Sequence, residues 1–136
     1  MLRTLSFALV LALAACSKSD APAKSQPATA AAATTPSAGK DSTAARKLLA
    51  EGVVVVDVRT PGEFSGGHVP NAANVPVQDL PGRIADIDKL VGGDKTKPVV
   101  VYCRSGNRSA TAKLHLEAAG YTNVVNGGGY DDLKTD

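Results

Sequence analysis

The thiol of Cys103 is the side chain in this sequence best suited to act as a nucleophile. It follows the apolar run Val99–Tyr102 and opens the polar segment Cys103–Ser109, which contains two arginines, and the next acidic residue is Glu117. Positive charge without a nearby carboxylate stabilises a thiolate. We therefore predict that the pKa of Cys103 lies below its ordinary value and that the residue acts as a nucleophile.

The residues that follow Cys103 have the composition of an anion cradle. Gly106 and Asn107 adopt positive φ more readily than most residues, which a tight turn requires. When such a turn leads into a helix, backbone N–H groups converge on one point and the helix end adds partial positive charge. The predicted anion-binding residues are consecutive in the sequence: Arg104, Ser105, Gly106, Asn107, Arg108 and Ser109.

Apolar runs and helical patterns alternate along the chain and indicate how this cradle is positioned. Continuous β-branched runs predict buried strands, and capped or amphipathic stretches predict helices. We predict strands over Val53–Val56, Val99–Tyr102 and Thr122–Val125, and helices from Asp41 or Ser42 to Leu49, after the capping box Thr60–Glu63, over Asp79–Val91 and over Ser109–Ala119. The alternation predicts one α/β domain with a central parallel β-sheet flanked by helices, whose ligands bind beyond the carboxyl ends of the strands.

The N-terminus has the pattern of a secretory signal peptide over residues 1–15. Arg3 supplies a positive charge, the stretch Leu5–Leu13 is apolar except for one serine, and two small residues, Ala14 and Ala15, precede a cleavage point. The stretch is too short to cross the hydrocarbon core of a bilayer as a helix, which takes about 20 residues. We therefore predict an exported protein without a transmembrane span at this end.

The next residue, Cys16, indicates how the exported chain is held. The run Leu13-Ala14-Ala15-Cys16 resembles the lipobox of bacterial lipoproteins. The resemblance implies a diacylglycerol on the Cys16 sulfur and a periplasm-facing protein anchored to the membrane by lipid. Ser17 implies sorting to the outer membrane if the source is Gram-negative. The alternative is a plain secreted protein with a cysteine at its new terminus.

Composition separates a tether from a folded domain. Residues 16–40 are rich in Ala, Pro, Ser and Thr and show no apolar periodicity, so after the lipidated cysteine we predict a disordered tether. Residues 41–136 carry all the predicted strands and helices and form the single folded domain.

Charge and cysteine content exclude several classes of function. The chain has 15 basic and 13 acidic residues, and removal of residues 1–15 takes away Arg3 alone, so the mature chain lacks the basic field of a nucleic-acid-binding protein. There are two cysteines, and lipidation uses Cys16. Cys103 is then the remaining thiol, with no partner for a disulfide or a thiolate metal cluster. We predict a monomer that needs no metal or other cofactor.

Three segments together resemble the rhodanese family. Cys103–Ser109 resembles its active-site loop, Asp57–Phe64 resembles the stretch after its first core strand, and Gly67–Pro76 resembles its second conserved motif. Their order and spacing agree from about residue 41 to residue 133. The chain departs from the family near its C-terminus, where Asn126 stands in place of an apolar residue before the glycines and Leu133 in place of a tryptophan.

The resemblance implies a thiosulfate sulfurtransferase. Cys103 would take the outer sulfur of thiosulfate or a similar small anionic donor, carry it as a persulfide and pass it to cyanide or a thiol. Residues 104–109 would hold the donor and the persulfide, with Arg104 and Arg108 orienting the anion.

Two other functions remain open. One is a non-enzymatic module at the membrane that carries sulfur or binds a partner protein, because carriage and transfer share the persulfide. The other is a phosphatase or arsenate reductase, because related folds use a cysteine loop for oxyanions. Four residues separate Cys103 from Arg108, whereas tyrosine phosphatases have five at this point. The shorter loop favours one sulfur atom over a tetrahedral phosphoryl group.

The remaining polar residues near these motifs are predicted to have structural roles. His68 is interpreted as a hydrogen-bonding residue, and Asp57 with Arg59 as an ion pair at a strand end. Asp131 and Asp132 are typical of a helix start, because adjacent carboxylates alone lack the ligand geometry of a metal site.

Overall fold

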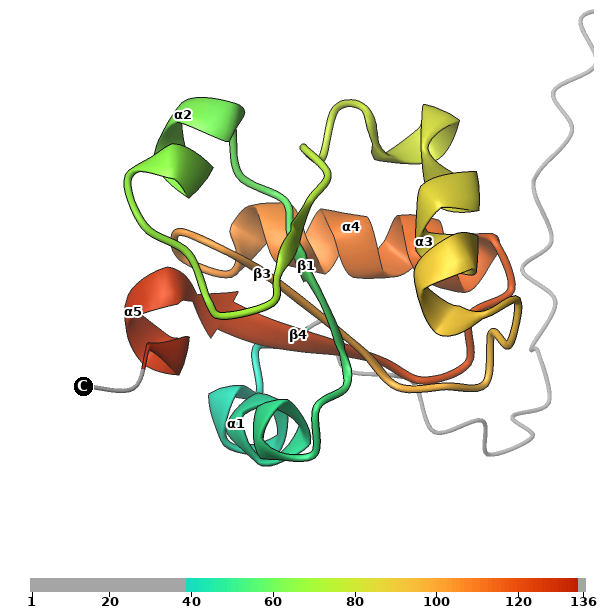
Figure 1. The fold of residues 1–136 in the computed structure, drawn as a ribbon, viewed down its shortest axis with the longest axis horizontal. Helices are drawn as coiled ribbons and strands as arrows, with labels where there is room; N and C mark the ends of the chain where they lie inside the picture. Colours follow the sequence, from blue (N-terminus) through green and yellow to red (C-terminus); the bar gives the residue numbers. More distant parts are fainter. Residues whose placement is uncertain (1–38, 135–136) are drawn as a thin grey trace, which may run out of the picture. The chain divides into compact units, whose positions relative to one another are not determined.

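The computed structural model describes residues 39–134, which form a four-stranded parallel sheet (Figure 1). The strands are β1 (Val54–Asp57), β2 (Ala73–Asn74), β3 (Val99–Cys103) and β4 (Val124–Gly129), in the spatial order β2-β1-β3-β4. All three strand pairs are parallel, so the carboxyl ends lie at one edge. The predicted α/β fold with a central parallel sheet is confirmed.

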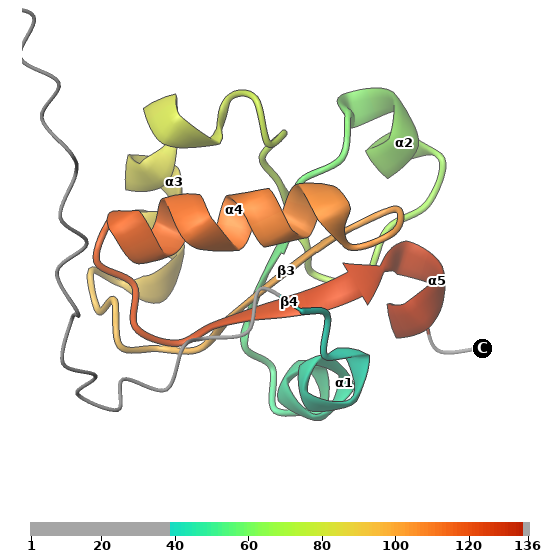
Figure 2. The same cartoon turned by 180° about the vertical axis from the view of Figure 1, so that it is seen from behind.

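Helices cover both faces of the sheet (Figure 2). One face packs against α1 (Ser42–Ala50) and α5 (Tyr130–Leu133), and the other against α3 (Ile84–Val91), α4 (Asn107–Ala118) and the short 3₁₀ helix Leu80–Gly82. The remaining helix, α2 (Pro61–Ser65), follows β1 at its carboxyl end. No helix within residues 39–134 is long and apolar enough to cross a membrane.

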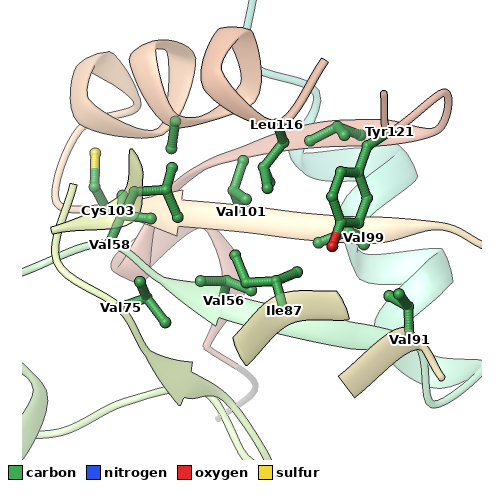
Figure 3. Close-up of a cluster of buried hydrophobic side chains, with 13 residues drawn as sticks. Val56, Val58, Val75, Ile87, Val91, Val99, Val101, Cys103, Leu116 and Tyr121 are labelled. Atoms are coloured by element: carbon green, nitrogen blue, oxygen red, sulfur yellow. The ribbon is translucent and has the colours of Figure 1, made fainter. Parts of the chain in front are cut away.

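Side-chain alternation along β3 divides the core into two clusters. Val99, Val101 and Cys103 belong to the cluster beneath α3 and α4, whereas Val100 and Tyr102 belong to the cluster beneath α1 and α5. Successive strand residues face opposite sides, so this division follows directly from the strand conformation. Cys103 lies at one end of the first cluster, which extends to Val91 at the other end (Figure 3). The alternation thus directs the thiol toward α4.

Local capping explains the starts of two helices, as predicted. The Asp41 carboxylate accepts a hydrogen bond from the backbone N–H of Ala44 at 2.9 Å and caps α1. Thr60 and Glu63 form a reciprocal capping box at the start of α2, with Pro61 as the first helical residue. These side chains satisfy N–H groups that have no partner inside the helix.

The helix predicted over Asp79–Val91 is interrupted, so that prediction is wrong in part. The segment forms a 3₁₀ turn over Leu80–Gly82 and then α3, with the non-helical Arg83 between them. Gly82 has a low helix propensity, which favours an interruption at this point. Val91 is buried, as expected, whereas Leu90 is 48% exposed, because α3 presents a narrower apolar face than its sequence pattern indicates.

The last strand is longer than the predicted Thr122–Val125. β4 continues through Asn126 and the three glycines to Gly129, with a bulge: Val101 pairs with Asn126 and Cys103 with Gly129, so three steps on β4 match two on β3. Gly128 adopts φ +86° at this bulge, a conformation that glycine adopts without steric cost. Composition alone assigns the three glycines to a loop, but pairing with β3 keeps them in an extended strand.

Three predictions lie outside the described residues. These are the signal peptide over residues 1–15, lipidation of Cys16 and the tether up to residue 38. The described part begins at residue 39, just before α1.

Candidate functional site

The candidate site lies at the carboxyl edge of the sheet, between β3 and α4. Cys103 is the last residue of β3, and residues 104–106 connect it to α4 in a short turn. The three-residue connection leaves no room for the chain to move far from the strand, so the start of α4 lies directly above the thiol. The parallel topology thus brings together the thiol and a helix N-terminus, as the sequence predicted.

The Cys103 sulfur is surrounded by hydrogen-bond donors. The backbone N–H of Gly106 donates to Sγ at 3.1 Å, and the Ser109 hydroxyl lies 3.6 Å from it. Burial raises the pKa of the thiol, but hydrogen bonds from the Ser109 hydroxyl and from the backbone N–H groups of Ser105, Ser109 and Gly106 outweigh it and lower the pKa. The predicted direction of the shift is confirmed, and its cause is hydrogen bonding in the cradle.

Glycines on two elements allow the turn to close. Gly106 adopts φ +99° and is the residue before α4. The backbone carbonyl of Arg104 packs against Gly129 so closely that a Cβ on Gly129 would lie 2.6 Å from the carbonyl oxygen. The bulge in β4 and its terminal glycine therefore support the cysteine loop from below.

The other loop residues divide into exposed and buried ones. Arg104, Ser105 and Asn107 are exposed, whereas Gly106 and Ser109 are buried with Cys103. Cys103 itself is only 1% exposed, so its sulfur lies beneath the loop and not on an open face of the domain. Arg104 contributes to a pocket of about 300 Å³ beside the loop, whose other lining residues are Arg59, Glu63, Gly66, Gly67, Tyr130 and Asp131.

Arg108 is paired with an acid that lies far away in the sequence. Its Nη1 and Nη2 donate to the two carboxylate oxygens of Glu63 at 2.7 and 2.8 Å. Hydrogen bonding from Arg108 lowers the pKa of Glu63 to about 2. The sequence has no acid between Cys103 and Glu117, but α2 brings Glu63 to the loop, where its charge offsets that of Arg108.

Asp57 and Arg59 form the predicted ion pair at the end of β1. Arg59 Nη2 donates to Asp57 Oδ2 at 2.6 Å and to the carbonyl of Gly67 at 2.7 Å, and both side chains are buried. The guanidinium carbon also lies 4.7 Å from the centre of the Tyr130 ring. These contacts connect β1, the segment before β2 and α5, and their number favours a structural role.

His68 makes local contacts. Its Nδ1 lies 3.0 Å from the carbonyl oxygen of Phe64, and its ring stacks on the Phe64 ring with centroids 3.8 Å apart. Asp131 and Asp132 lie in the first turn of α5, as predicted, and Asp132 Oδ2 accepts the backbone N–H of Gly129 at 2.9 Å.

Sequence reasoning missed three residues around the loop. Glu63 was interpreted only as part of a capping box, which it also forms. Asn126 was noted only as a departure from the family, yet its side chain hydrogen-bonds the loop. Lys113 has the pattern of an exposed helical residue, but it is 7% exposed and its Nζ donates to the Val124 carbonyl at 2.6 Å. The one signal at Asn126 is that it stands in place of an apolar residue before the glycines.

Comparisons with known proteins agree with this architecture. The model of the rhodanese-like domain family matches residues 41–136. A sulfurtransferase of Allochromatium vinosum is 41% identical over 76 residues, which are 56% of this chain and 65% of that protein. The thiosulfate sulfurtransferase PspE of Escherichia coli is 40% identical over 78 residues, which are 57% of this chain and 71% of that protein.

A solved structure supports the same assignment. A rhodanese from E. coli, solved with anions, is 37% identical and superposes with a TM-score of 0.54 over 61% of this chain and 93% of that chain. Fold, loop geometry and sequence relatives all agree, and the family model covers most of the sequence. This chain belongs to the rhodanese-like domain family.

Proposed function

We propose that the protein is a sulfurtransferase that moves sulfane sulfur from thiosulfate, or a similar small anionic donor, to cyanide or a thiol. The observation that carries this proposal is the Cys103 sulfur, held at the N-terminus of α4 within 3.1 Å of the Gly106 N–H. The names of the E. coli and A. vinosum relatives support the same reaction.

The proposed reaction has two displacement steps. The Cys103 thiolate attacks the outer sulfur of thiosulfate, an S–S bond forms, and the S–S bond of the donor breaks with sulfite leaving. The negative charge then lies on the outer sulfur of the persulfide. Cyanide or an acceptor thiolate then attacks that outer sulfur, and the S–S bond to Cys103 breaks. The products are thiocyanate or the acceptor's persulfide, and the Cys103 thiolate is restored. No proton transfer is needed when the thiolate is already formed, so the lowered pKa of Cys103 supports the first step.

The cradle suits the charge that moves through it. Backbone N–H groups and the helix end stabilise negative charge on either sulfur without reorganising. Arg104 is exposed at the loop and lines the neighbouring pocket, which supports a role in steering the incoming anion. The ion pair with Glu63 holds the Arg108 guanidinium in one orientation and offsets its charge. The proposed contribution of Arg108 is therefore to orient the anion more than to attract it.

The first experiment tests persulfide formation. The protein is incubated with thiosulfate, and intact mass is measured before and after cyanide treatment. We expect a gain of one sulfur atom that cyanide removes, with thiocyanate produced, and we expect Cys103→Ser to lose both. Persulfide formation or turnover in that variant would falsify the nucleophile assignment.

Two further assays separate the alternatives. Catalytic thiocyanate production in excess of enzyme distinguishes an enzyme from a carrier that is loaded once. Aryl phosphate hydrolysis and arsenate reduction by the same preparation test the oxyanion alternative. The loop Cys103–Arg108 has four intervening residues, which supports space for one sulfur atom, so we expect neither activity.

We also propose that the domain works at a membrane surface. The run before Cys16 supports removal of residues 1–15 and lipidation of Cys16, and the residues that follow support a tether that places the domain in the periplasm. Ser17 supports an outer-membrane location in a Gram-negative source.

A further inference from the structure

Asn126 is a buried polar side chain that has no role in the reaction steps proposed above. It is 2% exposed and lies in β4 opposite Val101, whose side chain faces α4. Paired residues on neighbouring strands point to the same face. The Asn126 amide therefore reaches the underside of the cysteine loop and hydrogen-bonds to it. A hydrophobic side chain at this position could not form these hydrogen bonds.

Two backbone groups define the orientation of the amide. Its Oδ1 accepts the N–H of Gly128 at 3.0 Å, and its Nδ2 donates to the carbonyl oxygen of Gly106 at 3.1 Å. A backbone N–H only donates and a carbonyl only accepts, so the oxygen faces the bulge and the nitrogen faces the loop.

The Ser109 hydroxyl lies between Asn126 and the reactive sulfur. Its oxygen is 2.7 Å from Asn126 Oδ1, 3.0 Å from the Gly106 carbonyl oxygen and 3.6 Å from Cys103 Sγ. A hydroxyl has one proton to donate. The Gly106 carbonyl already accepts from Asn126 Nδ2 and from the N–H of Ala110 at 2.9 Å, which occupies both of its lone pairs. The proton therefore chooses between Asn126 Oδ1 and the sulfur.

We propose that Asn126 is a positioning residue that keeps the Ser109 proton available to the Cys103 sulfur. Its nitrogen occupies the Gly106 carbonyl, which would otherwise hold the hydroxyl, and its oxygen provides a neutral acceptor for the proton while the sulfur is uncharged. When Sγ is a thiolate, the hydroxyl rotates to it, because a hydrogen bond to a charged acceptor is stronger than one to a neutral amide.

The same switch follows the charge through the proposed reaction. When the persulfide forms, the negative charge moves to the outer sulfur and Sγ becomes neutral, so the hydroxyl returns to Asn126. When the acceptor removes the outer sulfur, Sγ is again a thiolate and the hydroxyl turns back. The role in turnover rests on the proposed function, whereas the effect on the thiol exists without any substrate.

The charged side chains around the cysteine loop stay the same in every variant of the test. The variants below alter none of them: Arg108 of α4, Glu63 of α2, Arg59 after β1, Arg104 of the loop, Lys40 before α1, and Asp131 and Asp132 of α5.

The test measures the alkylation rate of Cys103 by iodoacetamide against pH in the full chain. The Cys103 peptide is followed by mass spectrometry, so that Cys16 does not contribute. Asn126→Leu frees the Gly106 carbonyl to capture the hydroxyl. We expect the midpoint of the pH profile to rise by about one unit, the scale of one such hydrogen bond. Ser109→Ala should raise it equally.

The double variant distinguishes the proposal from general support of the loop. In a Ser109→Ala background, Asn126→Leu should not move the midpoint further, because the proton it directs is gone. Additive shifts, or no shift in Asn126→Leu alone, overturn the proposal. Thermal unfolding identifies a variant that does not fold.

A second substitution keeps the shape of the side chain. Asn126→Asp retains the acceptor toward Ser109 and Gly128 but carries a carboxylate, which holds the hydroxyl and repels the thiolate, so the midpoint should rise above that of the wild type. An unchanged or lower midpoint contradicts the proposal. If the midpoint rises in the variants but the wild type transfers no sulfur, the positioning role is supported. The proposed function is then contradicted.

Discussion

At the scale of single residues, the lowered pKa of Cys103 depends on directed hydrogen bonds more than on a nearby positive charge. The Gly106 N–H donates to the sulfur and the Ser109 hydroxyl lies within hydrogen-bond reach of it, whereas the guanidinium of Arg108 is bound to Glu63. Both side chains of this pair are about one-third exposed. The net charge presented to an incoming anion is therefore smaller than the loop sequence indicates.

Substitutions of the Arg108–Glu63 pair should separate charge from position. Arg108→Ala should lower kcat/KM for thiosulfate about tenfold or more, because a charge-assisted contact is lost and the Glu63 carboxylate is left facing the loop. Glu63→Gln should have a smaller effect, since glutamine still serves the capping box of α2. The double variant should recover part of the loss of Arg108→Ala.

Lys47→Ala is a suitable control for these variants. Lys47 is exposed and lies on α1, which covers the opposite face of the sheet from α4. Its replacement should leave kcat/KM unchanged. Equal, small effects of Arg108→Ala and Lys47→Ala would argue against a role for Arg108 in anion binding.

The same pair should make stability depend on pH in the acidic range. Hydrogen bonding from Arg108 lowers the pKa of Glu63 from 4.5 to about 2 in the folded protein. Because the folded pKa lies below the unfolded one, the stabilisation is complete above pH 4.5 and is lost as the pH falls toward 2. The difference in Tm between wild type and Glu63→Gln should therefore shrink over this range, and a constant difference would contradict the assignment.

At the scale of elements, the end of β4 determines the shape of the cysteine loop. The bulge at Gly128 turns the strand so that Gly129 pairs with Cys103 and supports the carbonyl of Arg104. Gly127 fills a similar role on the other side, where a Cβ would lie 2.8 Å from Leu133 of α5. The strand, the loop and the terminal helix therefore pack closely together because Gly127 and Gly129 have no side chain.

Gly129→Ala should damage the site more than the fold. The new Cβ would meet the Arg104 carbonyl at 2.6 Å, and a backbone group cannot rotate away as a side chain can. The loop must shift, and a displacement of about 1 Å can reduce activity about a hundredfold. Overpacking should cost about 1–3 kcal/mol of stability.

Gly62→Ala is the matched control, because a Cβ at Gly62 in α2 has no heavy atom within 4 Å. Its kcat/KM should remain at the wild-type value. If Gly129→Ala also retains full activity, the loop does not depend on this contact.

At the scale of the whole molecule, the described domain is held together from both ends. The backbone N–H of Asp41 donates to the Asn126 carbonyl at 2.7 Å, and Lys40 forms an ion pair with Asp132 of α5 at 3.3 Å. The stem of Lys40 also packs near Gly106 and Gly128. The chain therefore enters the described domain beside the cysteine loop.

Membrane attachment should depend on Cys16 and not on the folded domain. In cells, the wild type should fractionate with membranes, because two or more acyl chains hold a protein stably on a bilayer. Cys16→Ala should appear as a soluble or unprocessed form with unchanged sulfur transfer per folded molecule. A wild-type protein recovered entirely in the soluble periplasmic fraction would contradict the anchor.

Much of the fold and the position of Cys103 could be predicted from the sequence. β-branched runs, the capping residues Asp41 and Thr60, and the transition from Tyr102 to a Gly-containing turn are local signals, because each depends on neighbouring residues along the chain. They predicted a parallel sheet, Cys103 at its carboxyl edge and a lowered pKa, and the structure agrees.

Contacts between distant segments were decided only by the tertiary structure. Glu63 lies 45 residues from Arg108, and Asn126 lies 17 from Ser109, so no local pattern could reveal either pair. The extension of β4 through its glycines likewise depends on pairing with β3, which overrides their preference for loops. The sequence by itself determined that Cys103 lies between a strand end and a helix start, because both are local features. The tertiary structure decided what surrounds its sulfur, because those partners meet only when the sheet and its helices pack.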